Sequence, residues 1–239
     1  MTELLNDETV QLPSLSKEGP VLKWCNTSFD YIGQDIDHTI YVDINATEES
    51  TVELPFINGE TIESIQIEGK EISFTQNGNM ITFAGSQFTS LVPGNNKINY
   101  ITSEKVYSAL CFACNMVINS KDKFLSFLKL NGAAQTAGTG LDGYYVLGSE
   151  IDLEGANLTA YNSDASDVTA VIPTSDNPWA GGFIGTFNGR GYKIKNFTIS
   201  WASRLSVFGD ISQGGSVINT VFEYASGMFN GYGGLVADS

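Results

Sequence analysis

The chain has 239 residues and carries 27 Asp+Glu against 12 Lys+Arg, which gives a formal net charge of −15. A surface this acidic repels phosphate backbones and anionic lipid, so the composition argues against nucleic-acid binding. No apolar stretch approaches the length of a membrane helix, and residues 1–8 lack the basic start and apolar run of a secretory signal. The sequence therefore predicts no membrane insertion and no export by the general secretory route.

Two segments of different character make up the first half of the chain. Residues 1–29 show no sustained hydrophobic period and contain Gly19-Pro20, so an extended N-terminal arm is predicted. Residues 30–116 contain short alternating apolar runs, separated by turn signals such as Asn58-Gly59 and Asn77-Gly78. These intervals predict a β-sandwich of immunoglobulin-like architecture, although the Cys and Trp spacing of true immunoglobulin domains is absent.

Residues 117–142 are predicted to form a linker and a capping helix. Ser120 is suited to cap the first turn of this helix, and Asn131-Gly132 is suited to end it. A helix here would cover the unpaired backbone groups and apolar core at the first coil of a solenoid. Its apolar stripe consists of Phe124, Leu125, Phe127 and Leu128.

Residues 143–239 contain a recurring motif, in which an apolar pair is followed by a glycine turn and a β-branched strand. One copy spans residues 182–199, a shorter copy spans residues 207–222, and a third begins at residue 233 and stops in mid-motif. Such self-similarity is expected of a solenoid, because single coils cannot bury their apolar faces alone. The sequence predicts an all-β chain that ends in a β-helix, incomplete at its C-terminus.

Ile184, Phe208 and Val236 occupy equivalent positions in the three copies, with steps of 24 and 28 residues between them. These glycine-flanked motifs resemble the GLUG repeats of bacterial cell-surface adhesins, secreted peptidases and some phage fibre proteins. The resemblance covers residues 117–239 and includes a lead-in strand at residues 143–153. It implies a right-handed parallel β-helix and no particular reaction, because the shared residues are turn glycines and core apolar residues.

Few residues have the types and spacing of metal or redox sites. Cys111 and Cys114 have the spacing of a zinc or redox pair, but no second cysteine pair or nearby histidine accompanies them, so buried free thiols are favoured. Cys25 makes the cysteine count odd, which argues against a complete disulfide framework. His38 is the only histidine and is interpreted as a surface or turn residue. No catalytic residue, metal or cofactor is therefore assigned.

Two groups of acidic residues leave alternatives open. Asp152 with Glu150 or Glu154, or Asp210 with another carboxylate, could form the acid pair of a glycosidase, but solvent-facing carboxylates are the favoured interpretation. The polar insert at residues 155–178 could bind calcium, but a solvated loop is favoured because its carboxylates lack a compact ligand pattern. The candidate ligands in this insert are Asn162, Asp164, Asp167 and Asp176.

Amides and aromatic rings of the second half also have two interpretations each. Asn196 and Asn219 occupy like positions of the motif, so their amides could stack as a ladder or serve as ordinary turn residues. The aromatic rings could stack on the sugars of a surface glycan, although burial in the coil interior or at a subunit interface is favoured for each. These rings belong to Tyr144, Tyr145, Tyr161, Trp179, Tyr192, Trp201, Tyr224 and Tyr232.

The features above predict a virion structural protein, namely the N-terminal attachment and shaft part of a phage tail fibre or tailspike that mediates host-surface adhesion. This segment is not expected to be an enzyme. Its expected partners are other virion proteins through the arm at residues 1–29, further copies in a homo-oligomer with a trimer favoured, and a host glycan or protein bound by a distal region. The protein would assemble in the host cytoplasm and reside in the virion. The alternatives are a glycan-degrading tailspike with catalytic groups beyond residue 239, and a bacterial cell-surface adhesin.

Overall fold

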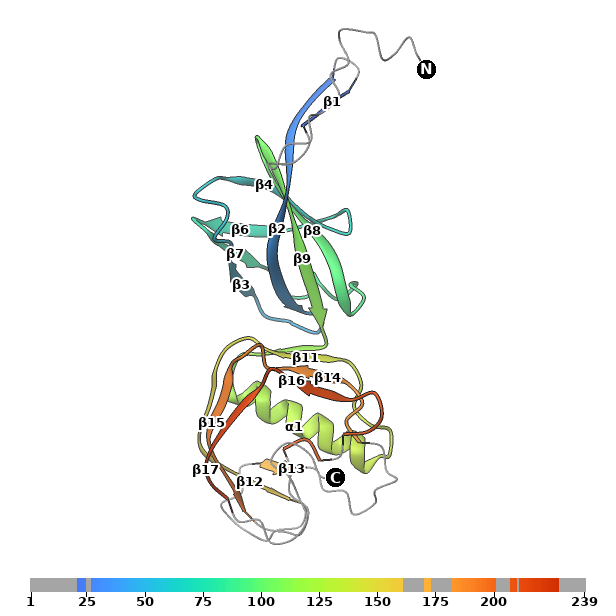
Figure 1. The fold of residues 1–239 in the computed structure, drawn as a ribbon, viewed down its shortest axis with the longest axis vertical. Helices are drawn as coiled ribbons and strands as arrows, with labels where there is room; N and C mark the ends of the chain where they lie inside the picture. The colour runs from blue at the N-terminus through green and yellow to red at the C-terminus, as the bar shows by residue number, and fades with distance from the viewer. Residues whose placement is uncertain are drawn as a thin grey trace. The chain divides into compact units, whose positions relative to one another are not determined.

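The computed structural model describes residues 21–24, 27–160, 170–172, 182–200, 207–209 and 211–227. This described part is predominantly β and contains one helix (Figure 1). The chain divides into two compact units, Met1–Ala113 and Cys114–Ser239. The second unit begins just before the predicted start at residue 117, because strand β10 (Met116–Ile118) pairs with β11 (Tyr144–Leu147) of that unit.

Two sheets form the first unit. The larger sheet has the strand order β1-β2-β9-β8-β4-β5, and the smaller sheet has the order β3-β7-β6. Antiparallel pairing joins β1 to β2, β4 to β5 and β8, β8 to β9, and β7 to both β3 and β6. The strands are β1 (Val21–Trp24), β2 (Thr27–Asp43), β3 (Ser50–Glu53), β4 (Ile62–Ile67), β5 (Lys70–Ile72), β6 (Phe74–Asn77), β7 (Met80–Phe83), β8 (Gly94–Thr102) and β9 (Lys105–Cys114).

Part of the segment predicted as an extended arm is a β-hairpin. Strand β1 pairs with β2, placing Lys23 opposite Ser28 and Trp24 opposite Thr27. The sequence gave no sign of this hairpin, because a strand of four residues is too short to establish a hydrophobic period. Residues 1–20 of the predicted arm lie outside the described residues.

The two sheets of the first unit share one apolar core. Ile98 and Tyr100 of β8 are buried, whereas Lys97 between them and Ile98 is followed by alternating exposure, as a strand with one buried face requires. Ile81 and Phe83 of β7, in the smaller sheet, belong to the same cluster of buried side chains. The alternating runs predicted over residues 30–116 therefore correspond to real strands with a common core.

The second unit contains two sheets in which the paired strands are parallel. One sheet has the order β10-β11-β14-β16, and the other has the order β13-β12-β15-β17. Isolated bridges add a third column, in which Leu141 pairs with Phe183 and Phe183 pairs with Ile211. The further strands are β12 (Ile151–Ala160), β13 (Ala170–Ile172), β14 (Thr186–Asn188), β15 (Lys193–Ser200), β16 (Ser216–Ile218) and β17 (Val221–Gly227).

The chain visits these three columns in the same order several times. From Phe183 it passes through β14 to β15, and from Ile211 it passes through β16 to β17. The structural step from position 183 to position 211 is thus 28 residues. The predicted equivalence of Ile184 with Phe208 was wrong, because Phe208 packs into the core without pairing, and Val236 lies outside the described residues.

Helix α1 (Lys121–Thr136) begins where the sequence predicted and ends later. The Ser120 hydroxyl accepts the Lys123 backbone N–H at 3.3 Å, as expected of an N-terminal cap. The predicted end at Asn131-Gly132 was wrong, because Asn131 is fully buried and its side-chain amide donates to the Phe208 carbonyl at 2.8 Å. Tertiary packing thus outweighs the local stop signal.

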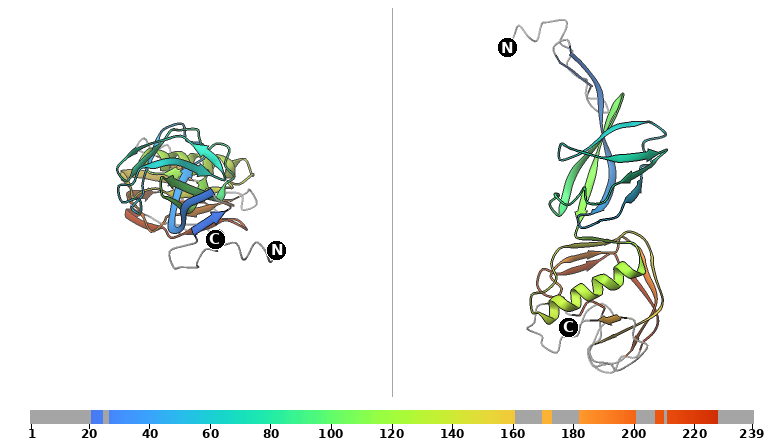
Figure 2. Two further views of the ribbon diagram at one scale, coloured as in Figure 1. Left: turned by 90° about the horizontal axis from the view of Figure 1, so that it is seen from above. Right: turned by 180° about the vertical axis from the view of Figure 1, so that it is seen from behind.

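The helix supplies a large part of the second core. It packs against β12 and β13, and from behind it lies in front of the strands of this unit (Figure 2). Phe127 is fully buried, and its ring centroid lies 5.0 Å from that of Tyr145, 5.2 Å from Phe187 and 5.7 Å from Phe208. These partners come from well-separated parts of the chain, so the helix holds successive segments together rather than serving only as a linker.

Candidate functional site

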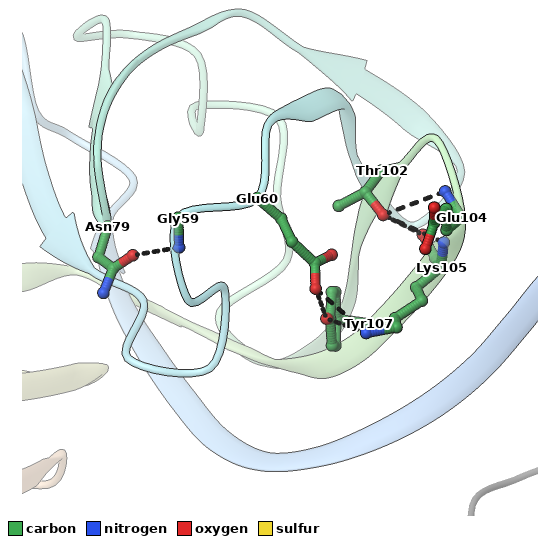
Figure 3. Close-up of polar contacts among 7 residues, drawn as sticks. All are labelled: Gly59, Glu60, Asn79, Thr102, Glu104, Lys105 and Tyr107. Atoms are coloured by element: carbon green, nitrogen blue, oxygen red, sulfur yellow. Dashed lines mark hydrogen bonds and ion pairs between the residues drawn. The ribbon is translucent and has the colours of Figure 1, made fainter.

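The most concentrated polar group of the first unit contains Glu60, Lys105 and Tyr107, and we call it the Glu60 cluster (Figure 3). The Tyr107 hydroxyl donates to Glu60 Oε1 at 2.8 Å, and Lys105 Nζ donates to the same oxygen at 3.1 Å. Lys105 and Tyr107 stand two residues apart on β9, so the strand's period of two places them on one face. Sequence analysis missed this cluster, because its members lie 45 and 47 residues apart along the chain.

Hydrogen bonds fix the loop that carries Glu60. The Gly59 N–H donates to Asn79 Oδ1 at 3.1 Å, and the Gln76 side-chain amide donates to the Glu60 carbonyl at 2.7 Å. The same Gln76 accepts the Ile62 N–H at 2.8 Å through its Oε1 atom. This loop is therefore held to the β6–β7 hairpin on one side and to β9 on the other.

The electrostatics of the Glu60 cluster favour a fixed ion pair. Partial burial alone would raise the pKa of Glu60, but hydrogen bonds from Tyr107 and Lys105 outweigh it, and the pKa is lowered. Burial, followed by the bond to Glu60, raises the pKa of Tyr107, and the bond to Glu60 raises the pKa of Lys105. None of these shifts brings a group toward neutral pH, where general acid–base catalysis operates best. The arrangement braces a loop and offers no proton-transfer chemistry.

Replacing Glu60 with glutamine tests this brace. We expect the free energy of unfolding of the first unit to fall by about 1 kcal/mol or less, because the pair is partly solvated. The lowered pKa means that the contribution of Glu60 is present at neutral pH and is lost as pH falls through a folded-state pKa below 4.5. Urea denaturation should therefore separate wild type from Glu60→Gln at pH 7 and not in strong acid. A Glu63→Gln control should match wild type at both pH values.

A second polar group lies on the sheet formed by β12, β15 and β17, and we call it the Lys195 group. Lys195 Nζ lies 2.6 Å from Glu150 Oε1 and 3.9 Å from Asp152 Oδ2. The Asn196 side-chain amide donates to both carboxylate oxygens of Asp152, at 3.0 and 2.9 Å. Each of these contacts joins β15 or its bulge to the segment around β12.

The Lys195 group does not have the electrostatics of a glycosidase acid pair. The Glu154 backbone N–H and then the Asn196 amide lower the pKa of Asp152, whereas a general acid needs a raised pKa. Glu150 is paired with Lys195, and Glu154 is paired with Lys121 at 2.9 Å. The described members of the candidate acid pair are thus used in cross-strand contacts. Asp210 lies outside the described residues.

The two asparagines of the motif do not occupy like positions. Asn196 lies within β15 at a register shift, whereas Asn219 lies between β16 and β17. Their φ angles are 54° and 51°, a left-handed conformation that asparagine tolerates better than most residues. Asn219 donates to Asn188 Oδ1 at 3.4 Å, so each amide bonds to a different column. The ladder between Asn196 and Asn219 was therefore a wrong prediction.

Cys111 and Cys114 are both free and buried. Burial, followed by the charge of Glu68, raises the pKa of the Cys111 thiol to about 12, so this thiol stays protonated and unreactive at neutral pH. The His38 ring packs edge-on against Phe56 at 5.4 Å. Within the described ranges, no group of three or more His, Cys, Asp and Glu side chains has an arrangement that could hold a metal ion. Cys25 is outside these ranges.

The Tyr100 hydroxyl is buried without a hydrogen-bond partner, and burial raises the pKa of this phenol. Removing the hydroxyl in Tyr100→Phe should increase the free energy of unfolding by about 1 kcal/mol, because a desolvated polar group disappears. Tyr107→Phe is the matched control, since Tyr107 lies opposite Tyr100 in the β8–β9 register and its hydroxyl is bonded to Glu60. This control should lower stability. A loss of stability in Tyr100→Phe equal to that of Tyr107→Phe would contradict the assignment.

The aromatic residues proposed as sugar platforms have different environments. Tyr145 is buried and its hydroxyl donates to the Asp142 carbonyl at 2.8 Å, whereas the Tyr144 side chain is 37% exposed. Tyr192 is half-buried, and the Arg190 guanidinium lies 5.5 Å from its ring centroid. Outside the described residues or side chains lie Tyr161, Trp179, Trp201, Tyr224 and Tyr232, together with the candidate calcium ligands Asn162, Asp164, Asp167 and Asp176.

Comparison of the chain with protein-family models, curated proteins and solved structures gave no match. Among the described residues, no helix is long and apolar enough to cross a membrane. The geometry of the two polar groups is therefore the main source of information about function.

Proposed function

We propose that this chain is a virion structural protein, namely the attachment and shaft part of a phage tail fibre or tailspike that mediates host-surface adhesion. In this proposal the first unit is an immunoglobulin-like β-sandwich that acts as an adaptor. The second unit is a right-handed parallel β-helix that forms the beginning of a shaft. Helix α1 covers the end of the shaft at which β10 and β13 lie.

One observation carries the proposal: β11, β14 and β16 stack in parallel beside β12, β15 and β17. A shaft needs a unit that lengthens by adding similar coils, and parallel strands joined through repeated crossovers satisfy this need. Crossover connections between parallel strands are right-handed in nearly all proteins, which supports the proposed handedness.

The use of polar side chains also supports a structural role. Glu60 accepts two hydrogen bonds that tie a loop to β9, and Asp152 accepts bonds that tie β12 to Asn196. In both places the bonding lowers the pKa of a carboxyl group and fixes its position. Catalytic carboxyl groups more often have raised pKa values and open faces.

The proposed partners follow from this role. Residues 1–20 would dock onto other virion proteins, and the shaft would associate with further copies of the chain, most readily as a trimer. A distal region would contact a glycan or protein on the host surface, where several weak contacts acting together give useful affinity. The protein would be assembled in the host cytoplasm and function in the virion.

A deletion of residues 1–20 tests the attachment role. This deletion leaves β1 and its pairing with β2 intact, so we expect the first unit to keep its unfolding transition while incorporation into particles is lost. A chain with residues 1–20 scrambled at constant composition is the matched control for charge, and it should also fail to incorporate. Normal incorporation of either variant would contradict the proposed docking, and a monomer in light scattering of the intact chain would contradict the oligomer.

A further inference from the structure

We propose that the edge formed by β16 and β17 binds an extended strand that carries basic side chains and lies parallel to them. We call this surface the β16–β17 edge. These strands are the last members of their sheets within the described part of the chain. Such an edge presents backbone N–H and C=O groups to an incoming strand, the mode of recognition known as β-augmentation. The edge would bind this partner whether the chain serves a virion or another structure.

Apolar side chains of the last coil are less covered than their equivalents in the preceding coil. Phe187 and Ile194 are fully buried, whereas the residues paired with them, Val217 and Phe222, are only partly buried. The same difference separates Phe183 from Ile211 in the third column. All three columns therefore lose cover together at this end of the stack.

Two further apolar side chains stand at the corner between these strands. Ile218 at the end of β16 is 43% exposed, and Val221 at the start of β17 is 44% exposed. By comparison, Asn188 occupies the position paired with Ile218 in the preceding coil, and Lys193 occupies the position paired with Val221. The last coil thus replaces polar positions with apolar ones at the surface that an added strand would cover.

Charge alternates across the sheet that ends at β17. The Glu150 and Asp152 carboxylates on one side contact Lys195, which lies on β15, and Lys193 of β15 contacts Glu223 of β17 at 3.4 Å. The order from strand to strand is therefore acidic, basic, acidic. The Glu223 side chain is 60% exposed, so it has room for a second basic partner on its far side. A strand with a Lys or Arg opposite Glu223 continues the alternation.

The same charges disfavour a second copy of the chain on this edge. Two-fold pairing of β17 with β17 of another copy would bring two acidic strands together, on chains that each carry a net charge of −15. Like charges directly opposite each other destabilise a strand pair. A basic strand with apolar residues over Val217 and Phe222 fits the edge in both charge and hydrophobicity.

A peptide with the sequence of residues 183–200 is a suitable probe, because β14 and β15 within it already lie parallel to β16 and β17. We expect the fluorescently labelled peptide to bind the intact chain weakly, in the high micromolar range. A peptide with Lys193→Glu and Lys195→Glu should bind about tenfold more weakly, because two attractions become repulsions. Fluorescence anisotropy measures both affinities.

Charge reversal on the protein makes the test specific. In Glu223→Lys the preference should invert, so that the acidic peptide binds better than the basic one. Glu71→Lys is the matched control, since it makes the same change in net charge on an exposed residue of the first unit, and it should keep the wild-type preference. Circular dichroism confirms folding, and Glu223→Gln, which should abolish the preference, replaces Glu223→Lys if that variant misfolds. No binding of either peptide, the same preference in all variants, or a stable dimer that excludes the peptide would overturn the proposal.

Discussion

Replacing Phe127 with alanine is expected to unfold the second unit while leaving the first unit folded. Phe127 is fully buried and contacts the rings of Tyr145, Phe183, Phe187 and Phe208. Truncating a buried phenylalanine costs about 4 kcal/mol through lost burial and the cavity left behind, a large part of the stability of a typical domain. Urea denaturation followed by circular dichroism should show one transition shifted to lower urea and one unchanged.

Leu130→Ala is the matched control on the same helix. The Leu130 side chain is 48% exposed, so its truncation should cost less than about 0.5 kcal/mol. Hydrogen exchange would assign each transition to its unit. A Phe127→Ala chain whose second unit is as stable as that of Leu130→Ala would show that the helix does not contribute to this core.

Gly215→Ala is expected to destabilise the second unit by about 3 kcal/mol. A Cβ atom at Gly215 would clash with the Phe183 carbonyl oxygen of the preceding coil and with the Ile211 side chain. The Phe183 carbonyl also accepts the Ser212 N–H at 3.0 Å, so it cannot retreat without breaking a bond between coils. Thermal unfolding should show the loss as a lower midpoint for the second unit.

Gly214→Ala separates this clash from ordinary backbone strain. Gly214 has a φ of 99°, and a Cβ atom there would meet open space. Its replacement should cost about 1 kcal/mol, the penalty of placing an L-residue in a left-handed conformation. Equal effects of the two substitutions would mean that close contact between coils is not what requires glycine at position 215.

Local signals in the sequence predicted the elements that depend on nearby residues. The Ser120 cap and the alternation of Ile98 and Tyr100 are set by positions within three residues of each other, and both are confirmed. The end of the helix was predicted wrongly, because Asn131 bonds to Phe208, 77 residues away in the chain. Burial at that distance leaves no signature in the local pattern.

The candidate sites show the same limit. The Glu60 cluster joins a loop residue to β9, and only the pairing of distant strands brings its members together. Asn196 and Asn219 follow similar short motifs, yet a register shift in β15 places them in different columns. One extra residue in a strand changes which side chains are neighbours, and composition does not reveal such a shift.

Mass spectrometry of purified phage particles from the native source tests the proposed function most directly. The proposal predicts that peptides from this chain remain with the particles through density-gradient purification, in a constant ratio to the other tail proteins. A deletion of residues 1–20 should remove them from the particles and leave the chain in the lysate. Recovery of the intact chain from the bacterial cell envelope, with none in the particles, would contradict a virion role.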